Sequence, residues 1–336
     1  MRIVITGASG NLGTGLLRQL AQSGGPAHEL VGVCRRLPPQ RAPYDQAEWF
    51  ALDISQPHAQ LELARAFEGA DAVVHLAWLI QPSYDREQLR RTNQDGSARV
   101  QAAVREAGVP HLVHASSVGV YSPRTDLDPV TEDWPREGVP SSHYSLDKAA
   151  VEHQLDELEQ HGDVVVSRVR PSLIMQGSAA SEISRYFLPH WLPPVLVRPG
   201  ALRLVPYPEQ FHLQFVHAND VGRAIVAVLE HRAPGAFNVA AGPAIDRGQW
   251  RRLFGRVAPS LPLPVVRALA AASWRAHLQP VDPGWVDLAA AAPLLDTTRI
   301  RELGWRPAHR ADEALTEFVG GLIRKSGTPS PALAPR

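Results

Sequence analysis

The sequence predicts an α/β protein in which helices cover both faces of a parallel β-sheet. Short runs of β-branched residues alternate with segments that carry apolar residues at helical spacing, which is typical of right-handed β-α-β crossovers. A glycine-rich stretch follows the first of these runs and precedes an amphipathic segment. We therefore expect a doubly wound, Rossmann-like sheet. Because the alternation weakens after about residue 170, we also expect a smaller C-terminal lobe.

Hydrophobic periodicity places the individual elements along the chain. Strands are expected at 2–6, 29–34, 48–52, 72–76, 111–115 and 164–169. Helices are expected over 11–22, 57–68, 84–107 and 142–160. A later passage contains a strand at 213–217, a helix over 219–230 and a strand at 236–239, and we expect it to return to the same sheet.

The glycine-rich turn has the sequence TGASGNLG at residues 6–13. Its place between a strand and a helix is that of a dinucleotide-binding turn, although its spacing is G-x-x-G-x-x-G. Its tight turn, its approach to a pyrophosphate and its close helix packing would require glycine, and the anion would lie at the positive end of the helix over 11–22. An ordinary β-α turn is the alternative. The cofactor-binding residues predicted here are Gly7, Ser9, Gly10, Asn11, Leu12 and Gly13.

The ends of the second and third strands bear on the choice of cofactor. The second strand ends in Cys34-Arg35-Arg36, without the acidic residue that NAD-binding folds often place there. Arginines suit a 2′-phosphate, so Arg35 and Arg36 favour NADP over NAD, unless they are merely a solvated pair. Asp53, which Ile54 follows, is a candidate for contacting the adenine or else caps the turn into the next helix.

These patterns divide the chain into two functional units and a tail. Residues 1–171, rejoined by 213–240, are expected to form a dinucleotide-binding domain. Residues 172–212 and 241–325 are expected to form a substrate-binding lobe. Residues 326–336 have few large apolar groups to offset the entropy of ordering, so we expect a disordered tail.

Composition excludes several classes of function. The 34 basic and 34 acidic residues balance, so neither a nucleic acid nor a membrane is an expected partner. No apolar stretch of about 18 residues and no leader-like start occurs, and the single Cys34 excludes an internal disulfide framework, which together suggest a cytoplasmic protein. The 14 histidines show no convincing ligand spacing, so we expect no metal site.

A tyrosine and a rare lysine suggest acid/base chemistry. Lys148 is one of only two lysines, and it follows Tyr144 by four residues on the predicted helix over 142–160, which places both side chains on one face. A nearby ammonium would lower the pKa of the phenol, so that Tyr144 can exchange a proton with a carbonyl oxygen or an alcohol as hydride moves. Ser116 and Ser117 follow the strand at 111–115, where a hydroxyl could hold the substrate oxygen or merely cap a helix.

Together these residues resemble the extended short-chain dehydrogenase/reductase family, whose large subgroup is called NAD-dependent epimerase/dehydratase. The matching motifs, in order, are TGASGNLG (6–13), Asp53-Ile54, His75-Leu76-Ala77, Asn93, Ser116-Ser117, Val120-Tyr121, Tyr144 to Lys148, Arg170-Pro171 with Ile174, Phe215-Val216-His217, Asp220-Val221, Phe237-Asn238 and Leu303-Gly304-Trp305. The resemblance implies that Ser117, Tyr144 and Lys148 are catalytic and that Lys148 also binds the nicotinamide ribose. It further implies that Ser116, Leu76, Ala77, Asn93 and Pro171 line or support the cofactor groove.

The sequence also departs from the family pattern at the substrate side. Trp78 stands where an alanine is usual, Met175 where a tyrosine is usual, and Leu213 where members that bind sugar nucleotides often carry an arginine. These three, with Ser117, are the predicted substrate-contacting residues, and they weaken the case for a nucleotide-sugar substrate.

We therefore expect an NAD(P)-dependent oxidoreductase that transfers hydride between nicotinamide and a carbonyl or secondary alcohol of a small molecule. One alternative is a sugar or nucleotide-sugar epimerase or dehydratase that retains its NAD. Another is a non-catalytic dinucleotide-sensing regulator, against which the intact Tyr-Lys pair argues. By analogy with the family, a homodimer through the helices over 84–107 and 142–160 is expected.

Overall fold

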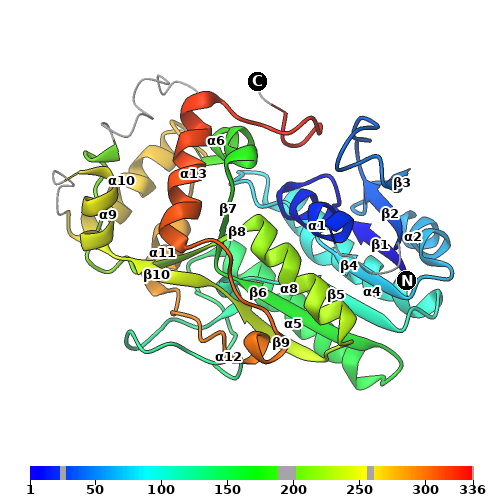
Figure 1. Ribbon diagram of the computed structural model, residues 1–336. Helices are drawn as coiled ribbons and strands as arrows, with labels where there is room; N and C mark the ends of the chain where they lie inside the picture. Colours follow the sequence, from blue (N-terminus) through cyan, green and yellow to red (C-terminus); the bar gives the residue numbers. More distant parts are fainter. Residues whose placement is uncertain (23–27, 188–201, 256–260, 335–336) are drawn as a thin grey trace.

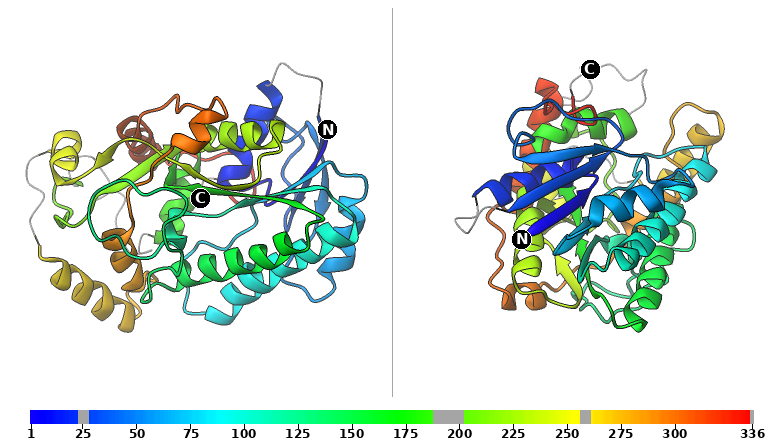
Figure 2. Two further views of the ribbon diagram at one scale, coloured as in Figure 1. Left: turned by 90° about the horizontal axis from the view of Figure 1, so that it is seen from below. Right: turned by 90° about the vertical axis from the view of Figure 1, so that its right-hand side faces the viewer.

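The computed structural model describes residues 1–22, 28–187, 202–255 and 261–334. In these residues seven parallel strands form one sheet, in the order β3-β2-β1-β4-β5-β6-β9. The strands are β1 (Arg2–Thr6), β2 (Glu29–Cys34), β3 (Ala47–Ala51), β4 (Ala72–His75), β5 (His111–Ala115), β6 (Val165–Pro171) and β9 (Gly235–Val239). Figures 1 and 2 show helices on both sides of this sheet, so the predicted Rossmann-like fold is confirmed.

Each face of the sheet has its own hydrophobic core. Ile3 and Ile5 face the side covered by α1 (Asn11–Gln22) and α8 (Ala218–Glu230). Val4 faces the other side, which is covered by α2 (Ala59–Phe67), α4 (Gly96–Glu106) and α5 (His143–Gln160). Because successive side chains of a strand alternate between faces, an apolar run such as the one in β1 requires cover on both sides.

The helix expected over 84–107 is interrupted. The structure has α3 (Arg86–Arg90), one π-helical turn at Arg91–Asp95, and then α4. A π turn often marks a functional position in a helix, and here it contains Asn93, which supports the site described below.

The passage after residue 212 only partly returns to the main sheet. The strand β9 pairs with β6 as expected, but β8 (Leu213–His217) lies in a second sheet, parallel to β7 (Leu173–Met175) and antiparallel to β10 (Ala241–Ile245). The expectation for 213–217 was therefore wrong. Because β9 already pairs with the free side of β6, β8 pairs with β7 and β10 instead. Phe215 of β8 consequently packs into the core of the lobe.

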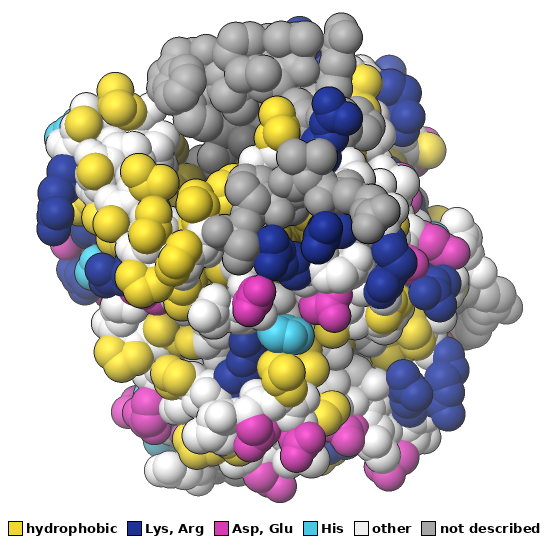
Figure 3. Space-filling view, turned by 90° about the vertical axis from the view of Figure 1, so that its left-hand side faces the viewer, with side chains coloured by type: hydrophobic (Ala, Val, Ile, Leu, Met, Phe, Trp, Pro, Cys, Tyr) yellow, Lys and Arg dark blue, Asp and Glu magenta, His cyan; other side chains and the backbone are white. Residues whose placement is uncertain are grey.

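Helices complete the C-terminal lobe around the small sheet. They are α6 (Ala180–Phe187), α9 (Arg247–Phe254), α10 (Leu263–Arg275), α11 (Gly284–Ala291) and α13 (Ala311–Arg324), whereas α12 (Thr298–Glu302) packs against β9 of the main sheet. Figure 3 shows apolar side chains gathered at the end of the molecule where α10 lies, and Val265 and Leu269 of this helix are exposed. Residues 188–201, which belong to the predicted lobe, lie outside the described residues.

The C-terminal segment is not the disordered tail that composition suggested. In residues 326–334, Leu333 is fully buried and Ser330 Oγ donates a hydrogen bond to the Ser9 carbonyl at 2.7 Å. Arg185 donates to the carbonyl oxygens of Ala332 and Ala334 at 2.6 and 2.9 Å. One buried leucine and several hydrogen bonds to the rest of the protein order a segment whose composition alone would not. In Figure 1 it runs from α13 toward α1.

Among the helices that the structure describes, none combines the length and apolarity needed to cross a lipid bilayer.

Candidate active site

A cavity of about 540 Å³ lies at the carboxyl ends of the central strands, where α/β sheets bind ligands. Most of the predicted site residues line it, although they come from distant parts of the sequence. These are Gly7, Ser9, Gly10, Asn11, Leu12, Gly13, Arg35, Arg36, Asp53, Ile54, Leu76, Ala77, Trp78, Ser116, Ser117, Tyr144, Lys148, Pro171, Met175 and Leu213. The fold therefore brings the predicted cofactor-binding residues and the predicted catalytic residues into one cavity. Their positions in the sequence alone could not show this.

The glycine-rich turn connects β1 to α1 and leaves no room for side chains at two of its glycines. Gly7 has a φ of +74°, and a Cβ there would lie 2.6 Å from the backbone nitrogen of Ala77. A Cβ at Gly13 would lie 2.4 Å from the Ala8 carbonyl oxygen. The turn thus packs directly on the neighbouring backbone, and the start of α1 faces the cavity, as a site for a phosphate group requires.

The ends of β2 and β3 supply charged groups to the same cavity. Arg35 and Arg36 line it directly after β2. Asp53 lines it too, but one of its carboxylate oxygens accepts a hydrogen bond from the Ser55 N–H at 2.9 Å, so this side chain also caps the turn.

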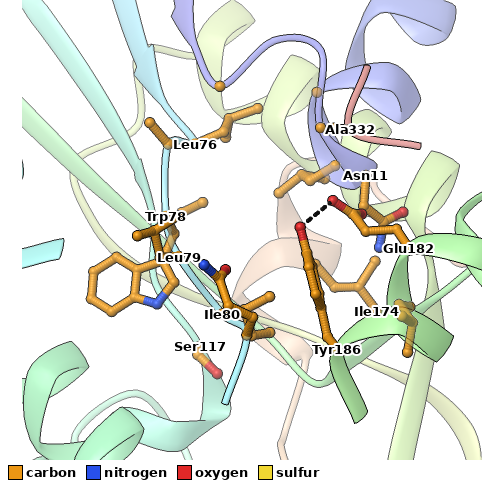
Figure 4. A pocket seen from close by; sticks show the side chains of 18 of the residues that line it. Asn11, Leu76, Trp78, Leu79, Ile80, Ser117, Ile174, Glu182, Tyr186 and Ala332 are labelled. Carbon is orange, nitrogen blue, oxygen red and sulfur yellow. Dashed lines mark hydrogen bonds between the residues drawn. The ribbon is translucent and has the colours of Figure 1, made fainter. Parts of the chain in front are cut away.

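A carboxyl group that was not predicted also lines this cavity. Glu182 of α6 lines the cavity and accepts a hydrogen bond from the Tyr186 hydroxyl at 3.1 Å (Figure 4). Burial raises the pKa of Glu182 to about 7, although the charge of Arg36 opposes the rise. No motif marks this residue, and only the folding of α6 over the cavity brings it to the cofactor side.

Asn93 supports the site without lining the cavity. Its amide donates to the Leu79 carbonyl at 3.0 Å, and its side-chain oxygen accepts from the Leu79 N–H at 2.8 Å. This pair of bonds fixes the segment after β4 that carries Leu76, Ala77 and Trp78 past the cavity.

Tyr144 lies in the first turn of α5, next to Ser117. The helix begins there because the Ser142 side chain accepts a hydrogen bond from the Ser145 N–H. Burial raises the pKa of Tyr144 to about 12, and a hydrogen bond with the Ser117 side chain opposes the rise. The phenol is therefore protonated near neutral pH. Gly119 makes room for the ring, because a Cβ there would lie 2.9 Å from Tyr144 Cε1.

The contacts of Lys148 in the structure differ from the predicted pairing with Tyr144. Its ammonium donates to the Ala115 carbonyl at 2.8 Å and lies 3.5 Å from the centre of the Trp78 ring. Burial lowers the pKa of Lys148 to about 7, while the charge of Glu152 opposes the fall. We expected Lys148 to lower the pKa of Tyr144, but this pKa is raised. Burial of the phenol dominates, and the hydrogen bond with Ser117 supplies the opposing effect.

A buried polar network lies behind the two serines. Ser116 Oγ donates to Glu152 at 2.5 Å, and Glu152 also accepts from Arg170 Nε at 2.8 Å. Burial would raise the pKa of Glu152, but the hydrogen bond and charge of Arg170 outweigh it and lower this pKa. Ser116 therefore lines the cavity with its hydroxyl engaged in the network, and Ser117 presents the hydroxyl that lies beside Tyr144.

Aromatic rings surround the phenol of Tyr144. The Trp285 ring stacks on it with centroids 4.9 Å apart, and the Trp78 ring meets it edge-on at 6.3 Å. Phe187 in turn meets Trp285 edge-on at 5.0 Å. Trp285 was not predicted, because it lies in a segment of the lobe without a recognisable motif.

The family model described as "NAD dependent epimerase/dehydratase family" matches residues 3–240 of the chain. An uncharacterized protein of Mycobacterium tuberculosis (strain H37Rv) is 29% identical over 322 residues, which are 95% of this chain and 30% of that protein. The chain thus spans about a third of the length of such mycobacterial relatives. The 2′-dehydrokanamycin reductase of Streptomyces kanamyceticus is 28% identical over 286 residues, covering 82% of this chain and 71% of the reductase.

A solved structure of similar fold is a UDP-glucose-4-epimerase from Stenotrophomonas maltophila with bound NAD and formylated UDP-arabinopyranose. It has a TM-score of 0.70 and 20% sequence identity, with 96% of this chain and 98% of the epimerase covered.

Proposed function

Because the chain belongs to the NAD-dependent epimerase/dehydratase family, we propose that it is an NAD(P)-dependent oxidoreductase acting on a carbonyl or secondary alcohol of a small molecule. The observation that carries this proposal is that Tyr144, Ser117 and Lys148 line one cavity with the glycine-rich turn. A proton donor at one end and an anion-binding helix start at the other are the two features that hydride transfer from a dinucleotide requires.

The residues present fit such a cofactor. The glycine-rich turn and the start of α1 would hold the pyrophosphate, since the backbone at Gly7 and Gly13 is packed too closely for side chains. Arg35, Arg36 and Asp53 would face the adenosine end, and Lys148 the nicotinamide ribose. A bound nicotinamide supplies or accepts the hydride at the reacting carbon.

The protein residues supply the proton and the position. Tyr144 Oη donates its proton to the carbonyl oxygen of the substrate, and Ser117 Oγ donates a hydrogen bond to the same oxygen, which develops negative charge. Solvent then restores the phenolic proton. Because burial raises the pKa of Tyr144 to about 12, the phenol carries its proton near neutral pH, which is the form that reduction of a ketone requires at its start.

The choice between NADP and NAD depends on opposing charges. Arg35 and Arg36 suit a 2′-phosphate, and on this basis we propose NADP as the preferred cofactor. Glu182 lines the same cavity and partly offsets the charge of Arg36, so NAD is the competing choice. The name of the kanamycin-related relative agrees with a reductase.

An epimerase or dehydratase that retains its NAD is the second candidate, because the chain shares its fold with an NAD-bound UDP-glucose-4-epimerase. A dinucleotide that stays bound through purification would favour this candidate over a reductase that releases its cofactor. A homodimer remains a prediction, and the helices that would form it, α4 and α5, lie side by side (Figure 2).

The test begins with a fluorescence titration of NADPH and NADH against the purified protein and an Arg35→Ala/Arg36→Ala variant. A panel of carbonyl compounds is then offered to the wild type and to Tyr144→Phe. We expect NADPH affinity to fall in the arginine variant, and turnover to fall about 10²- to 10⁴-fold in Tyr144→Phe with unchanged cofactor affinity. Equal turnover by the wild type and Tyr144→Phe would refute the assigned role of Tyr144.

A further inference from the structure

Trp285 covers one face of the Tyr144 ring. The two rings are inclined by only 30°, with centroids 4.9 Å apart, and Trp285 lines the same cavity as the phenol. Phe187 of α6 meets the indole edge-on at 89°. The phenol, Trp285 and Phe187 therefore form a continuous aromatic wall that joins α5 to two lobe helices.

The position of Trp285 is fixed by the residue before it. A Cβ at Gly284 would lie 2.2 Å from the Ser141 carbonyl oxygen, so the start of α11 touches the backbone that leads into α5. Asp282 accepts a hydrogen bond from the Gly284 N–H at 2.8 Å and holds this start in place. The stacked pair is therefore set by a backbone contact that lies one residue from Trp285 and three residues from Tyr144, and not by the side chains alone.

The charged groups of the cavity lie away from this wall or are already engaged. Arg35, Arg36 and Asp53 follow β2 and β3, and Lys148 is directed to Ala115 and Trp78. Among the described residues, no further arginine or lysine lines the cavity. A diphosphate requires cationic or multiple N–H partners beyond those that the cofactor would occupy.

The remaining wall beside the phenol is apolar. Leu288 and Ala292 of the α11 region, Ile183 of α6, and Leu213 and Met175 of the small sheet line the cavity with the aromatic rings. A site of this kind binds uncharged groups by burial of apolar surface and by ring stacking, with Ser117 and Tyr144 as the few polar groups that orient the carbonyl.

We propose that Trp285 is a specificity-determining residue, and that with Phe187 it makes this site select uncharged ketones that carry an apolar or aromatic group beside the carbonyl, in preference to sugar nucleotides. This inference rests on the proposed function for the reaction, but the binding preference is separate from the chemistry. The apolar group stacks on Trp285 while the carbonyl oxygen reaches Tyr144 and Ser117.

The experiment measures binding without turnover. The protein is loaded with NADP⁺, or with NAD⁺ if that cofactor binds more tightly, so that an added ketone cannot be reduced. Acetophenone and UDP-glucose are titrated by calorimetry into the wild type, Trp285→Ala, Trp285→Phe and Trp274→Ala. Trp274 is a matched control, because it also stacks on a tyrosine, Tyr84, at 5.4 Å but does not line the cavity.

We expect the wild type to bind acetophenone more tightly than UDP-glucose. Trp285→Ala should weaken acetophenone binding about three- to tenfold, whereas Trp285→Phe should keep most of the affinity and Trp274→Ala all of it. Unchanged dinucleotide affinity in each variant shows that the fold is retained. Tighter binding of UDP-glucose, or equal acetophenone affinity in the wild type and Trp285→Ala, would overturn the inference.

Failure of the inference can be told from failure of the proposed function. If acetophenone binds in a Trp285-dependent way but NADPH and NADH never reduce it or any other carbonyl compound, the specificity inference stands and the reductase proposal fails. If ketones are reduced with a dependence on Tyr144 but bind equally well without Trp285, the reductase proposal stands and the inference fails.

Discussion

Burial sets the protonation of the two central side chains. It raises the pKa of Tyr144 and lowers that of Lys148, so both side chains favour their uncharged forms. The hydroxyl of Ser117 opposes this effect at the phenol, and the charge of Glu152 opposes it at the ammonium. The protonation of the site thus depends on how completely Tyr144 and Lys148 are buried.

The buried lysine should make stability depend on pH. Below about pH 7 Lys148 is charged in both the folded and the unfolded state, and burial of the charge lowers the free energy of unfolding in full. Between about 7 and 10.5 the folded protein releases a proton that the unfolded chain keeps, so this cost shrinks as pH rises. Lys148→Met should therefore raise the free energy of unfolding more at pH 6 than at pH 9.

Urea unfolding at the two pH values measures this difference. Lys325→Met is the matched control, because Lys325 is the other lysine of the chain and is exposed, and its effect should be the same at both pH values. An equal effect of Lys148→Met at pH 6 and pH 9 would contradict the assigned burial of the charge.

At the level of single residues, the sequence predicted those that belong to local motifs. Tyr144 and Lys148 could be predicted because they lie four residues apart on one helix, and the rarity of lysine made that spacing informative. Glu182 and Trp285 could not, because each reaches the cavity only through the packing of a lobe helix. The contact of Lys148 with Trp78 could not be predicted either, since the position of the Trp78 ring depends on the loop that Asn93 holds.

At the scale of elements, the contact between α1 and α8 holds the glycine-rich turn against the sheet. Gly15 and Gly222 let the two helix backbones approach, and a Cβ at Gly15 would lie 2.7 Å from the Ala218 carbonyl oxygen. Periodicity predicted both helices to within a few residues, but not this contact, since nothing in the sequence shows which helices are neighbours. The prediction for β8 was wrong for a similar reason, because the sequence does not show which sheet edge is free for this strand to pair with.

Gly15→Ala should push α1 away from α8. Overpacking against a backbone atom costs about 1–3 kcal/mol of unfolding free energy, which outweighs the gain of ~1 kcal/mol from replacing a helical glycine by alanine. Gly320→Ala in α13 is the control, because its Cβ would meet only the movable end of Arg324 at 3.1 Å, and this variant should be neutral or slightly stabilising. Chemical denaturation compares the two, and a stable Gly15→Ala protein would contradict the packing described.

At the scale of the whole molecule, the C-terminal segment connects the lobe to the glycine-rich turn. Ser330 bonds to the Ser9 carbonyl, while Pro331 and Ala332 line the cavity. Composition suggested disorder because few apolar residues occur in this segment, and composition does not show that Leu333 is buried against the rest of the protein.

Leu333→Ala should release this segment. Loss of a buried leucine side chain costs about 2–5 kcal/mol in a packed core. The other contacts of this short terminal segment are too few to offset that loss. We expect faster tryptic cleavage after Lys325 and a severalfold weaker affinity for the dinucleotide. Leu61→Ala, at a leucine that is 60% exposed, should change neither. Unchanged cleavage in Leu333→Ala would show that the segment is not held by this leucine.

In the proposed reaction, Tyr144 supplies the proton and a nicotinamide cofactor supplies the hydride. The most direct measurement follows deuterium from NADPH or NADH that carries deuterium at both hydrogen positions of nicotinamide C4 into the carbonyl compound that the wild type reduces fastest. We predict one deuterium at the carbinol carbon for each oxidised cofactor released, and a rate lower by about 10²- to 10⁴-fold in Tyr144→Phe, with cofactor affinity retained. An alcohol product without deuterium, or equal rates in the two proteins, would contradict this account.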